Sequence, residues 1–208
     1  MSLVLKALAR KAESDVIARL DELRDERTVY VTEIVGCTMR PRLRATAPLL
    51  SIETSLAPPV VLGTLAHEGL ARLASYVPAG SDCRVHTEYE LEAVVEGVRV
   101  KGRVDLLVVC RDGCTVVELK TGRSAPDEAK RHHELQVQVY LDLLRLTEGL
   151  ECRGEILYIT HEGYAVFEVS PRPGVLEALV RDYLANSAAP RWSWECDYCP
   201  WRSICPRR

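Results

Sequence analysis

Gly102-Arg103-Val104-Asp105 and Glu118-Leu119-Lys120 are the two segments that decide the expected fold of this chain. The apolar, β-branched residues between them flank Asp112-Gly113, a dipeptide typical of tight hairpin turns. A two-residue turn at Asp112-Gly113 would place Asp105 opposite Lys120 and diagonal to Glu118. All three side chains would then point to one face of the sheet, where two carboxylates can hold a divalent ion beside a cationic catalyst.

The elements around this hairpin predict a mixed α/β fold. A second hairpin turns at Glu96-Gly97, and the strands are apolar on both faces, which indicates a sheet covered on both sides. Hydrophobic periodicity predicts core helices at 60–76, 127–147 and 173–186 and further strands at 154–160 and 164–169. We expect an amphipathic helix at 1–27, a Pro-rich connector at 48–59, and a tail at 190–208 that is too short for a core of its own.

Composition narrows the class of protein. The chain has 208 residues, 47% of them hydrophobic, which is enough for one sizeable core within a single domain over 1–208. We find neither an apolar run of roughly 20 residues, as a membrane span needs, nor a signal peptide, and we expect a cytoplasmic protein without membrane contact. The net charge of −3 means that any nucleic-acid contact must come from a local basic patch.

Four further residues could support a metal site. His67 lies one helical turn after Gly63; a lone histidine is most often a satisfied structural residue, but with two carboxylates it suits Mn²⁺ or Mg²⁺. Gln136 and Tyr140 share one helix face, which alone is weak evidence. Glu88 would lie opposite Asp105, and we interpret it as a strand partner or exposed edge residue in preference to a supporting acid.

Four short motifs follow one another along the chain: Gly-x-x-x-His at 63–67, Gly-x-x-Asp at 102–105, Glu-x-Lys at 118–120 and Gln-x-x-x-Tyr at 136–140. Their order and spacing resemble the RecB-like branch of the PD-(D/E)xK nuclease superfamily. The resemblance implies a nuclease core at 60–170, with a central mixed sheet flanked by helices. It implies that His67, Asp105, Glu118 and the Leu119 carbonyl bind Mn²⁺ or Mg²⁺. Lys120 would be the catalytic lysine, and Gln136 and Tyr140 would complete the site.

Eight cysteines are many for a chain of this size. From the residues alone, Cys37 with Cys196, Cys199 and Cys205 could bind zinc or an iron–sulfur cluster. One cysteine before the nuclease motifs and three after them is similar to the CRISPR-associated RecB-like exonucleases, which implies a 4Fe-4S or 2Fe-2S cluster joining 30–47 to 190–208. The other four are interpreted as packed or surface thiols, with a Cys110–Cys114 disulfide as the alternative: Cys83, Cys110, Cys114 and Cys152.

The expected function is a metal-dependent exonuclease on single-stranded DNA ends, working in CRISPR spacer acquisition. The alternatives are a structure-selective endonuclease of the same superfamily and a non-catalytic, cluster-bearing DNA adaptor of the CRISPR integrase. An integrase complex and homo-oligomers are the further expected partners. Arg40, Arg42, Arg44 and Arg202 are a candidate DNA surface. Four aromatic residues could stack on bases or instead pack over the cluster: Trp192, Trp194, Tyr198 and Trp201.

Overall fold

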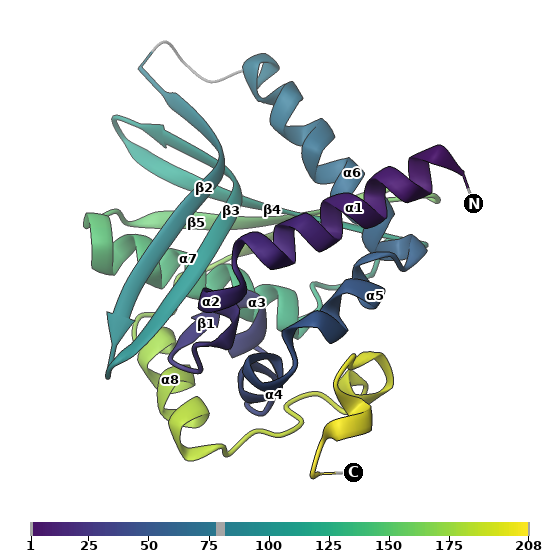
Figure 1. Ribbon diagram of the computed structural model, residues 1–208. Coiled ribbons are helices and arrows are strands. Elements are labelled where there is room, and N and C mark those ends of the chain that lie inside the picture. Colours follow the sequence, from purple (N-terminus) through teal and green to yellow (C-terminus); the bar gives the residue numbers. More distant parts are fainter. Residues whose placement is uncertain (1, 78–81, 208) are drawn as a thin grey trace.

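The computed structural model describes residues 2–77 and 82–207. Its centre is a mixed six-stranded sheet with the order β1-β3-β4-β5-β6, in which β2 also pairs with β3 (Figure 1). β1–β3 and β4–β5 are parallel, and the other pairs are antiparallel. The strands are β1 Thr28–Tyr30, β2 Arg84–Val95, β3 Val98–Cys110, β4 Gly113–Gly122, β5 Cys152–Thr160 and β6 Tyr164–Val169.

Strand β3 changes its neighbour halfway along one edge. β1 pairs with residues 99–101 of β3, and β4 pairs with residues 106–110. We call the intervening residues 102–105 the fork. Asp105 closes the fork, so its carboxylate lies where two strands part and a side chain or ion can enter from the edge.

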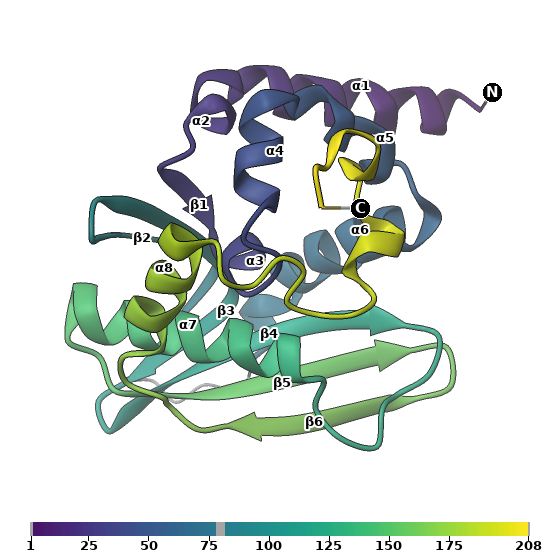
Figure 2. The ribbon, with the colours of Figure 1, turned by 90° about the horizontal axis from the view of Figure 1, so that it is seen from below.

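Helices cover both faces of the sheet next to the fork. α7 (Arg131–Glu148) packs against β5, β2 and β4, and α6 (Pro58–Leu73) packs against β4 and β3. Glu118 contacts Gln136 of α7, whereas Gly63 of α6 lies over Thr121. Because successive side chains alternate along a strand, the two helices lie on opposite faces of β4. The expectation of a sheet covered on both sides is right here, but Ile159, Tyr164 and Val166 leave part of β5 and β6 exposed (Figure 2).

The N-terminal third is more broken than its sequence suggests. The expected helix at 1–27 is α1 (Leu3–Ala18) and α2 (Leu20–Arg24), which meet at Arg19. The remaining helices before the sheet are α3 Val31–Ile34, α4 Arg40–Thr46 and α5 Ser51–Ser55, so the Pro-rich connector is largely helical. α6 has no buried residue, so it is an exposed helix and not the core helix that its periodicity predicts. No single helix in the described ranges could cross a membrane; by length and composition alone, the bent pair Pro48–Ser55 and Pro58–Tyr76 could.

The chain returns past α3 and α4 after the sheet. α8 (Val175–Ala185) packs against α7 and α3, and the tail that follows forms two short 3₁₀ turns, Glu195–Tyr198 and Arg202–Ile204. Trp192 Nε1 donates to the Val35 carbonyl and Trp201 Nε1 to the Ala47 carbonyl. The tail therefore lies beside α4, as both ribbon views show.

The β3–β4 hairpin turns at Arg111-Asp112, not at Asp112-Gly113. Cys110 pairs with Gly113, and Leu106 pairs with Val117. Continued by one step, this register places Asp105 directly opposite Glu118, where we expected Lys120. A shift of two residues leaves every side chain on the same face, so the hydrophobic pattern could not distinguish the two registers.

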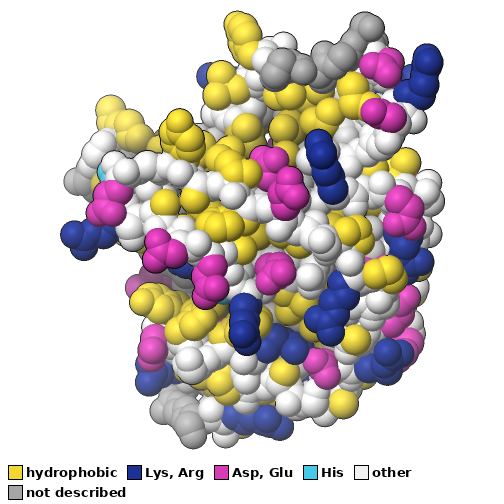
Figure 3. All heavy atoms as spheres, turned by 180° about the vertical axis from the view of Figure 1, so that it is seen from behind, with side chains coloured by type: hydrophobic (Ala, Val, Ile, Leu, Met, Phe, Trp, Pro, Cys, Tyr) yellow, Lys and Arg dark blue, Asp and Glu magenta, His cyan; other side chains and the backbone are white. Residues whose placement is uncertain are grey.

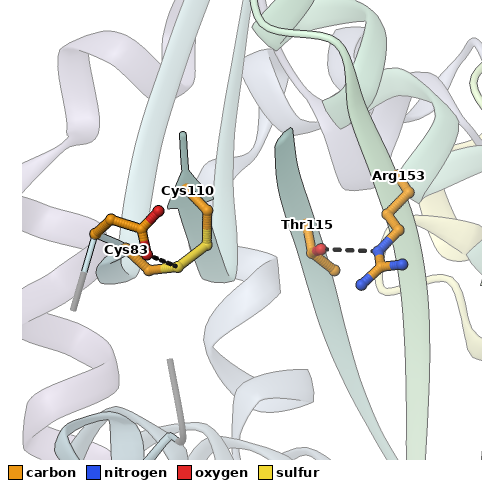
Figure 4. The surroundings of a disulfide bond; sticks show 5 residues. Cys83, Cys110, Thr115 and Arg153 are labelled. Atoms are coloured by element: carbon orange, nitrogen blue, oxygen red, sulfur yellow. Dashed lines mark hydrogen bonds between the residues drawn. A yellow bond between two sulfur atoms is a disulfide. The ribbon is translucent and has the colours of Figure 1, made fainter. Parts of the chain in front are cut away.

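The four cysteines outside the expected cluster set form two disulfides, which corrects both sequence interpretations. Cys83 bonds to Cys110, and Cys114 bonds to Cys152. The first bridges the start of β2 to the end of β3, close to the Arg153–Thr115 hydrogen bond between β5 and β4 (Figure 4). A Cys110–Cys114 bond does not form, because Cys114 lies opposite Val109 on one side and Cys152 on the other.

Candidate active site

His67 and Asp105 meet at the fork. His67 Nδ1 lies 2.8 Å from Asp105 Oδ1, and Leu119 N donates to Asp105 Oδ2 at 2.7 Å. The hydrogen bond to Asp105 raises the pKa of His67, against the lowering effect of burial. The N–H and C=O of one extended residue point to the same edge of a strand, so the Leu119 carbonyl also faces the side of Asp105.

Glu118, Lys120, Gln136 and Tyr140 form a second, connected group on the α7 face. Lys120 Nζ donates to Glu118 Oε1 at 2.6 Å and to Gln136 Oε1 at 2.9 Å. Gln136 Nε2 donates to Glu118 Oε1 at 2.8 Å and to the Tyr140 hydroxyl at 3.1 Å. Gln136 and Tyr140 are both buried, so they hold Glu118 and Lys120 in place from behind.

One atom of this group lacks a partner. Glu118 is 3% exposed, and its buried Oε2 accepts no hydrogen bond from any residue in 2–77 or 82–207. Burial raises the pKa of the Glu118 carboxyl, although the Lys120 ammonium opposes the shift and Asp105 adds to it. A buried acceptor left unsatisfied is costly, and a cation beside it would remove that cost.

More acidic residues lie at the site than the sequence motifs suggest. Ligand atoms of His67, Glu88 and Asp105 all lie within 4.8 Å of one another. Glu88 also pairs with Arg103, with Oε2 and Nε 2.7 Å apart. Glu88 is thus opposite Asp105, as the hairpin register predicts, and its carboxylate reaches the His67–Asp105 pair. An imidazole with several carboxylates fits Mg²⁺ or Mn²⁺.

Four free cysteines surround one cavity. Cys37, Cys196, Cys199 and Cys205 line a pocket of about 680 Å³, together with Arg40 and Arg202. Burial raises the pKa of the Cys37 thiol. The cysteines that sequence grouped are therefore gathered in space, although 159 residues separate Cys37 from Cys196 in the chain.

Sequence reasoning missed Glu195, which connects the tail to this cavity. Its Oε1 accepts from Cys37 N at 2.8 Å and from Arg40 Nη2 at 3.4 Å. Its Oε2 accepts from Arg191 N and Trp192 N, both at 2.9 Å. A Cβ on Gly36 would lie 2.5 Å from Oε1, so the glycine makes room for the carboxylate. No motif singles out Glu195; only its place beside Cys196 could have drawn attention to it.

The arginines expected to bind DNA do different things. Arg44 is 3% exposed; it pairs with Glu33 and donates to the Leu23 and Thr28 carbonyls, so it is structural, contrary to our expectation. Arg42 donates to the Thr38 and Tyr183 carbonyls and stacks over the Tyr183 ring. Arg40 and Arg202 line the cysteine cavity.

The aromatic residues of the tail also divide. Trp201 is buried and Trp192 is partly buried, and their indole N–H groups bind backbone carbonyls, which fits packing rather than base stacking. Trp194 and Tyr198 are exposed by 40% and 75%, and their ring centroids are 6.5 Å apart. The Trp194 ring lies 4.9 Å from the His132 ring at the start of α7, tilted by 56°. Burial, with the Lys120 charge as the next cause, lowers the pKa of His132. Trp194 therefore lies beside the first turn of α7, with the Tyr198 ring next to it.

The comparisons with known proteins agree with this geometry. Residues 79–206 match the model of the PD-(D/E)XK nuclease superfamily. The chain is 30% identical over 192 residues to the CRISPR-associated exonuclease Cas4 of Saccharolobus solfataricus, covering 91% of this chain and 92% of that protein. The crystal structure of SSO0001 superimposes with a TM-score of 0.80 at 30% identity, covering 99% of this chain and 97% of that one. The expected α/β nuclease fold is confirmed, and the chain belongs to the PD-(D/E)XK nuclease superfamily, in the family of the CRISPR-associated exonuclease Cas4.

Proposed function

We propose that this nuclease is a metal-dependent DNA exonuclease that acts on single-stranded ends and processes fragments for CRISPR spacer acquisition. The observation that carries the proposal is the buried, unpartnered Glu118 Oε2, next to Lys120 and one strand away from the His67–Asp105 pair. Acidic oxygens and a lysine held this close suit phosphodiester hydrolysis. The exonuclease name of the Saccharolobus solfataricus relative supports attack at ends.

Each residue of the site has a defined part in this reaction. His67, Asp105, Glu118 and the Leu119 carbonyl would hold Mn²⁺ or Mg²⁺, which when bound supplies an activated water and a Lewis acid for the phosphate. Lys120 places its ammonium where negative charge develops on the phosphoryl oxygens. Gln136 fixes that ammonium through Oε1 while Nε2 fixes Glu118, and Tyr140 holds Gln136 in turn.

End-labelled linear and circular single-stranded DNA test the proposal with Mn²⁺ present. We expect wild-type protein to shorten linear DNA and leave the circle intact, and Asp105→Asn, Glu118→Gln and Lys120→Met each to lose at least about 100-fold in rate. Cutting of the circle would show an endonuclease of the same superfamily instead. DNA binding without cutting would show an adaptor, and wild-type rates in all three variants would refute the site.

Single-stranded DNA would reach this site across the tail. Arg40 and Arg202 supply positive charge, and Trp194 and Tyr198 offer exposed rings on which bases can stack. The buried rings of Trp192 and Trp201 are left to packing. Trp194→Ala and Tyr198→Ala should weaken binding to single strands without changing the fold.

The four-cysteine cavity would hold a 4Fe-4S or 2Fe-2S cluster. Around one tetrahedral zinc, with Zn–S near 2.3 Å, sulfur atoms lie about 3.8 Å apart. Within the described residues, no three of these thiols have sulfur atoms that all lie within 4.8 Å of one another. The thiols are therefore spaced more widely than the ligands of one zinc ion. Visible absorption with stoichiometric iron and sulfide, lost in Cys37→Ala, is the expected result; zinc without visible absorption would contradict it.

Exposed apolar side chains support contact with another protein. They gather on α1, on the 3₁₀ turn Pro48–Leu50 and on α6, and include Leu3, Val4, Leu62, Leu65 and Leu73. In the rear view, hydrophobic side chains are dense in the upper part, the level at which Figure 1 places α6 (Figure 3). A CRISPR integrase or a second copy of this chain is the proposed partner. Size measurements alone and with the integrase distinguish the two.

A further inference from the structure

We propose that Glu88 is an additional ligand of the active-site divalent ion, and that Arg103 competes with the ion for its carboxylate. This inference rests on the proposed metal-dependent function. It adds to the His67, Asp105, Glu118 and Leu119 set a residue outside every sequence motif described above.

The first support is the placement of the ligand atoms. Those of His67, Glu88 and Asp105 lie within 4.8 Å of one another, as they do around one ion with ligand distances of about 2.1 Å. Glu118 is outside this group, and its Oε1 is already bound by Lys120 and Gln136. Glu88 is thus the acid that already lies within ligand distance of the His67–Asp105 pair.

The second support is the backbone of β2. Glu88 has φ of 52°, a left-handed conformation that costs a residue with a side chain about 1 kcal/mol or more. The β2–β3 ladder pairs Thr87 with Leu106 and Tyr89 with Val104, but it omits Glu88 and Asp105. The residues of β3 that face the core are even-numbered as far as Val104, but the next one in the core cluster is Leu107. The regular alternation of side chains is therefore interrupted at the same place. Both strands therefore leave regular geometry where the two carboxylates meet.

The third support is the balance of charge. Glu88 and Asp105 are two carboxylates held close together, and the unpartnered Glu118 Oε2 is a third acidic group nearby. Arg103 neutralises Glu88, but its side chain is 62% exposed, so the pair is held weakly and a divalent ion can displace it. His67 and Lys120 alone do not offset three carboxylates.

A purely structural ion pair is the competing explanation, and the same hairpin provides its control. Glu92, four residues further along β2, pairs with Arg99 and Lys101 of β3. Glu92 lies on the same strand as Glu88 and also forms ion pairs with β3, but in the described part of the chain it belongs to no group of possible metal ligands, and its backbone is not left-handed. Glu92→Gln therefore reports the loss of an ion pair without the loss of a ligand.

Mn²⁺ binding to the full chain, followed by electron paramagnetic resonance of the free ion, tests the proposal without using activity. Glu88→Gln should weaken Mn²⁺ binding at least about tenfold, and Glu92→Gln should leave it unchanged. Glu88→Gly should weaken binding equally while its melting temperature stays level or rises, because glycine relieves the left-handed backbone. Arg103→Gln should tighten binding by up to about fivefold, but not in the Glu88→Gln background.

Asp105→Asn separates failure of this inference from failure of the proposed function. If Asp105→Asn abolishes Mn²⁺ binding while both Glu88 variants bind like wild type, the metal site stands and Glu88 is a structural residue. If Asp105→Asn also binds like wild type, the metal site itself is wrong. Equal tightening by Arg103→Gln with and without Glu88 would show a general charge effect and refute the competition.

Discussion

The burial of Glu118 is a cost that the proposed divalent ion would offset. Its side chain loses solvation, its Oε2 has no hydrogen-bond partner among the residues that the structure describes, and burial raises its pKa. Glu118→Gln removes the charge and keeps the shape. We therefore expect unchanged or higher stability in urea without divalent ions, together with loss of DNA cleavage. A protein that becomes less stable by more than about 2 kcal/mol would show that Glu118 supports the fold directly.

His133 predicts how stability depends on pH. Burial, with the Lys120 charge as the next cause, lowers the pKa of His133 to about 2, and the same causes lower that of His132 to about 4. Both start from an ordinary value of 6.5, so below it the unfolded chain binds more protons than the folded one and stability falls as pH drops. His133→Gln, which can still pair with the Tyr158 hydroxyl, should flatten this fall.

Urea unfolding midpoints measured between about pH 4 and 6.5 check the prediction. The raised pKa values of Glu33 and Glu118 change stability with pH in the opposite direction, and subtracting the wild-type profile from that of the variant removes their contribution. His161→Gln, at an exposed position beyond β5, is the matched control. If both histidine variants follow the wild-type slope, burial of His133 does not govern the acid side of the profile.

At the scale of elements, the fork depends on a missing side chain. A Cβ on Gly102 would lie 2.7 Å from Tyr140 Cε1 and 2.7 Å from Val31 Cγ2, so α7 and α3 approach β3 only because residue 102 is glycine. Gly102→Ala should cost about 1–3 kcal/mol of stability through overpacking and should shift Tyr140 and Gln136. Gly69→Ala, on α6 with open space around its Cβ, should be neutral or stabilising. Equal urea midpoints for the two variants would contradict the close approach.

The two disulfides fasten one end of the strands that carry the site. They close loops of 27 and 38 residues, and in the chain-entropy model each stabilises the fold by up to about 3.5–4 kcal/mol. Cys114→Ala with Cys152→Ala should therefore lower the melting temperature by roughly 5–15 °C, with wild-type Mn²⁺ binding at the far end of β4. A melting curve unchanged by the substitutions, or by a reductant, would show that the sheet needs no such fastening.

These pairings show what sequence could and could not predict at this scale. The Glu96-Gly97 turn gives the β2–β3 register, and extending it backwards places Cys83 opposite Cys110. A sequence prediction that extended β2 back to Arg84 would therefore have included that disulfide. Cys114–Cys152 was not, because it depends on a parallel pairing between strands that a helix separates. A turn motif predicts the register only of the two strands that it joins directly.

At the scale of the whole molecule, the short motifs predicted the fold and a set of residues that the structure brings together, because each motif lies on one element and its periodicity gives its face. His67, Asp105, Glu118, Lys120, Gln136 and Tyr140 all lie where those elements meet. The exposed state of α6, the burial of Arg44 and the approach of the Glu88 carboxylate to His67 depend on long-range packing. The local sequence pattern contains no information about such packing, so these three features could be learned only from the structure.

Glu195 predicts how the tail is held to the rest of the molecule. Its buried carboxylate accepts hydrogen bonds from the backbone of Cys37, Arg191 and Trp192, and so it joins the two segments that carry the four free cysteines. Glu195→Ala would leave three backbone donors unpaired, at about 1–3 kcal/mol each, a cost that detachment of the tail would relieve. We expect faster proteolysis after residue 186 and less iron per chain, whereas Asp197→Ala, two residues on and exposed, should match wild type. Wild-type proteolysis and iron content in Glu195→Ala would show that the tail is held in place without the Glu195 carboxylate.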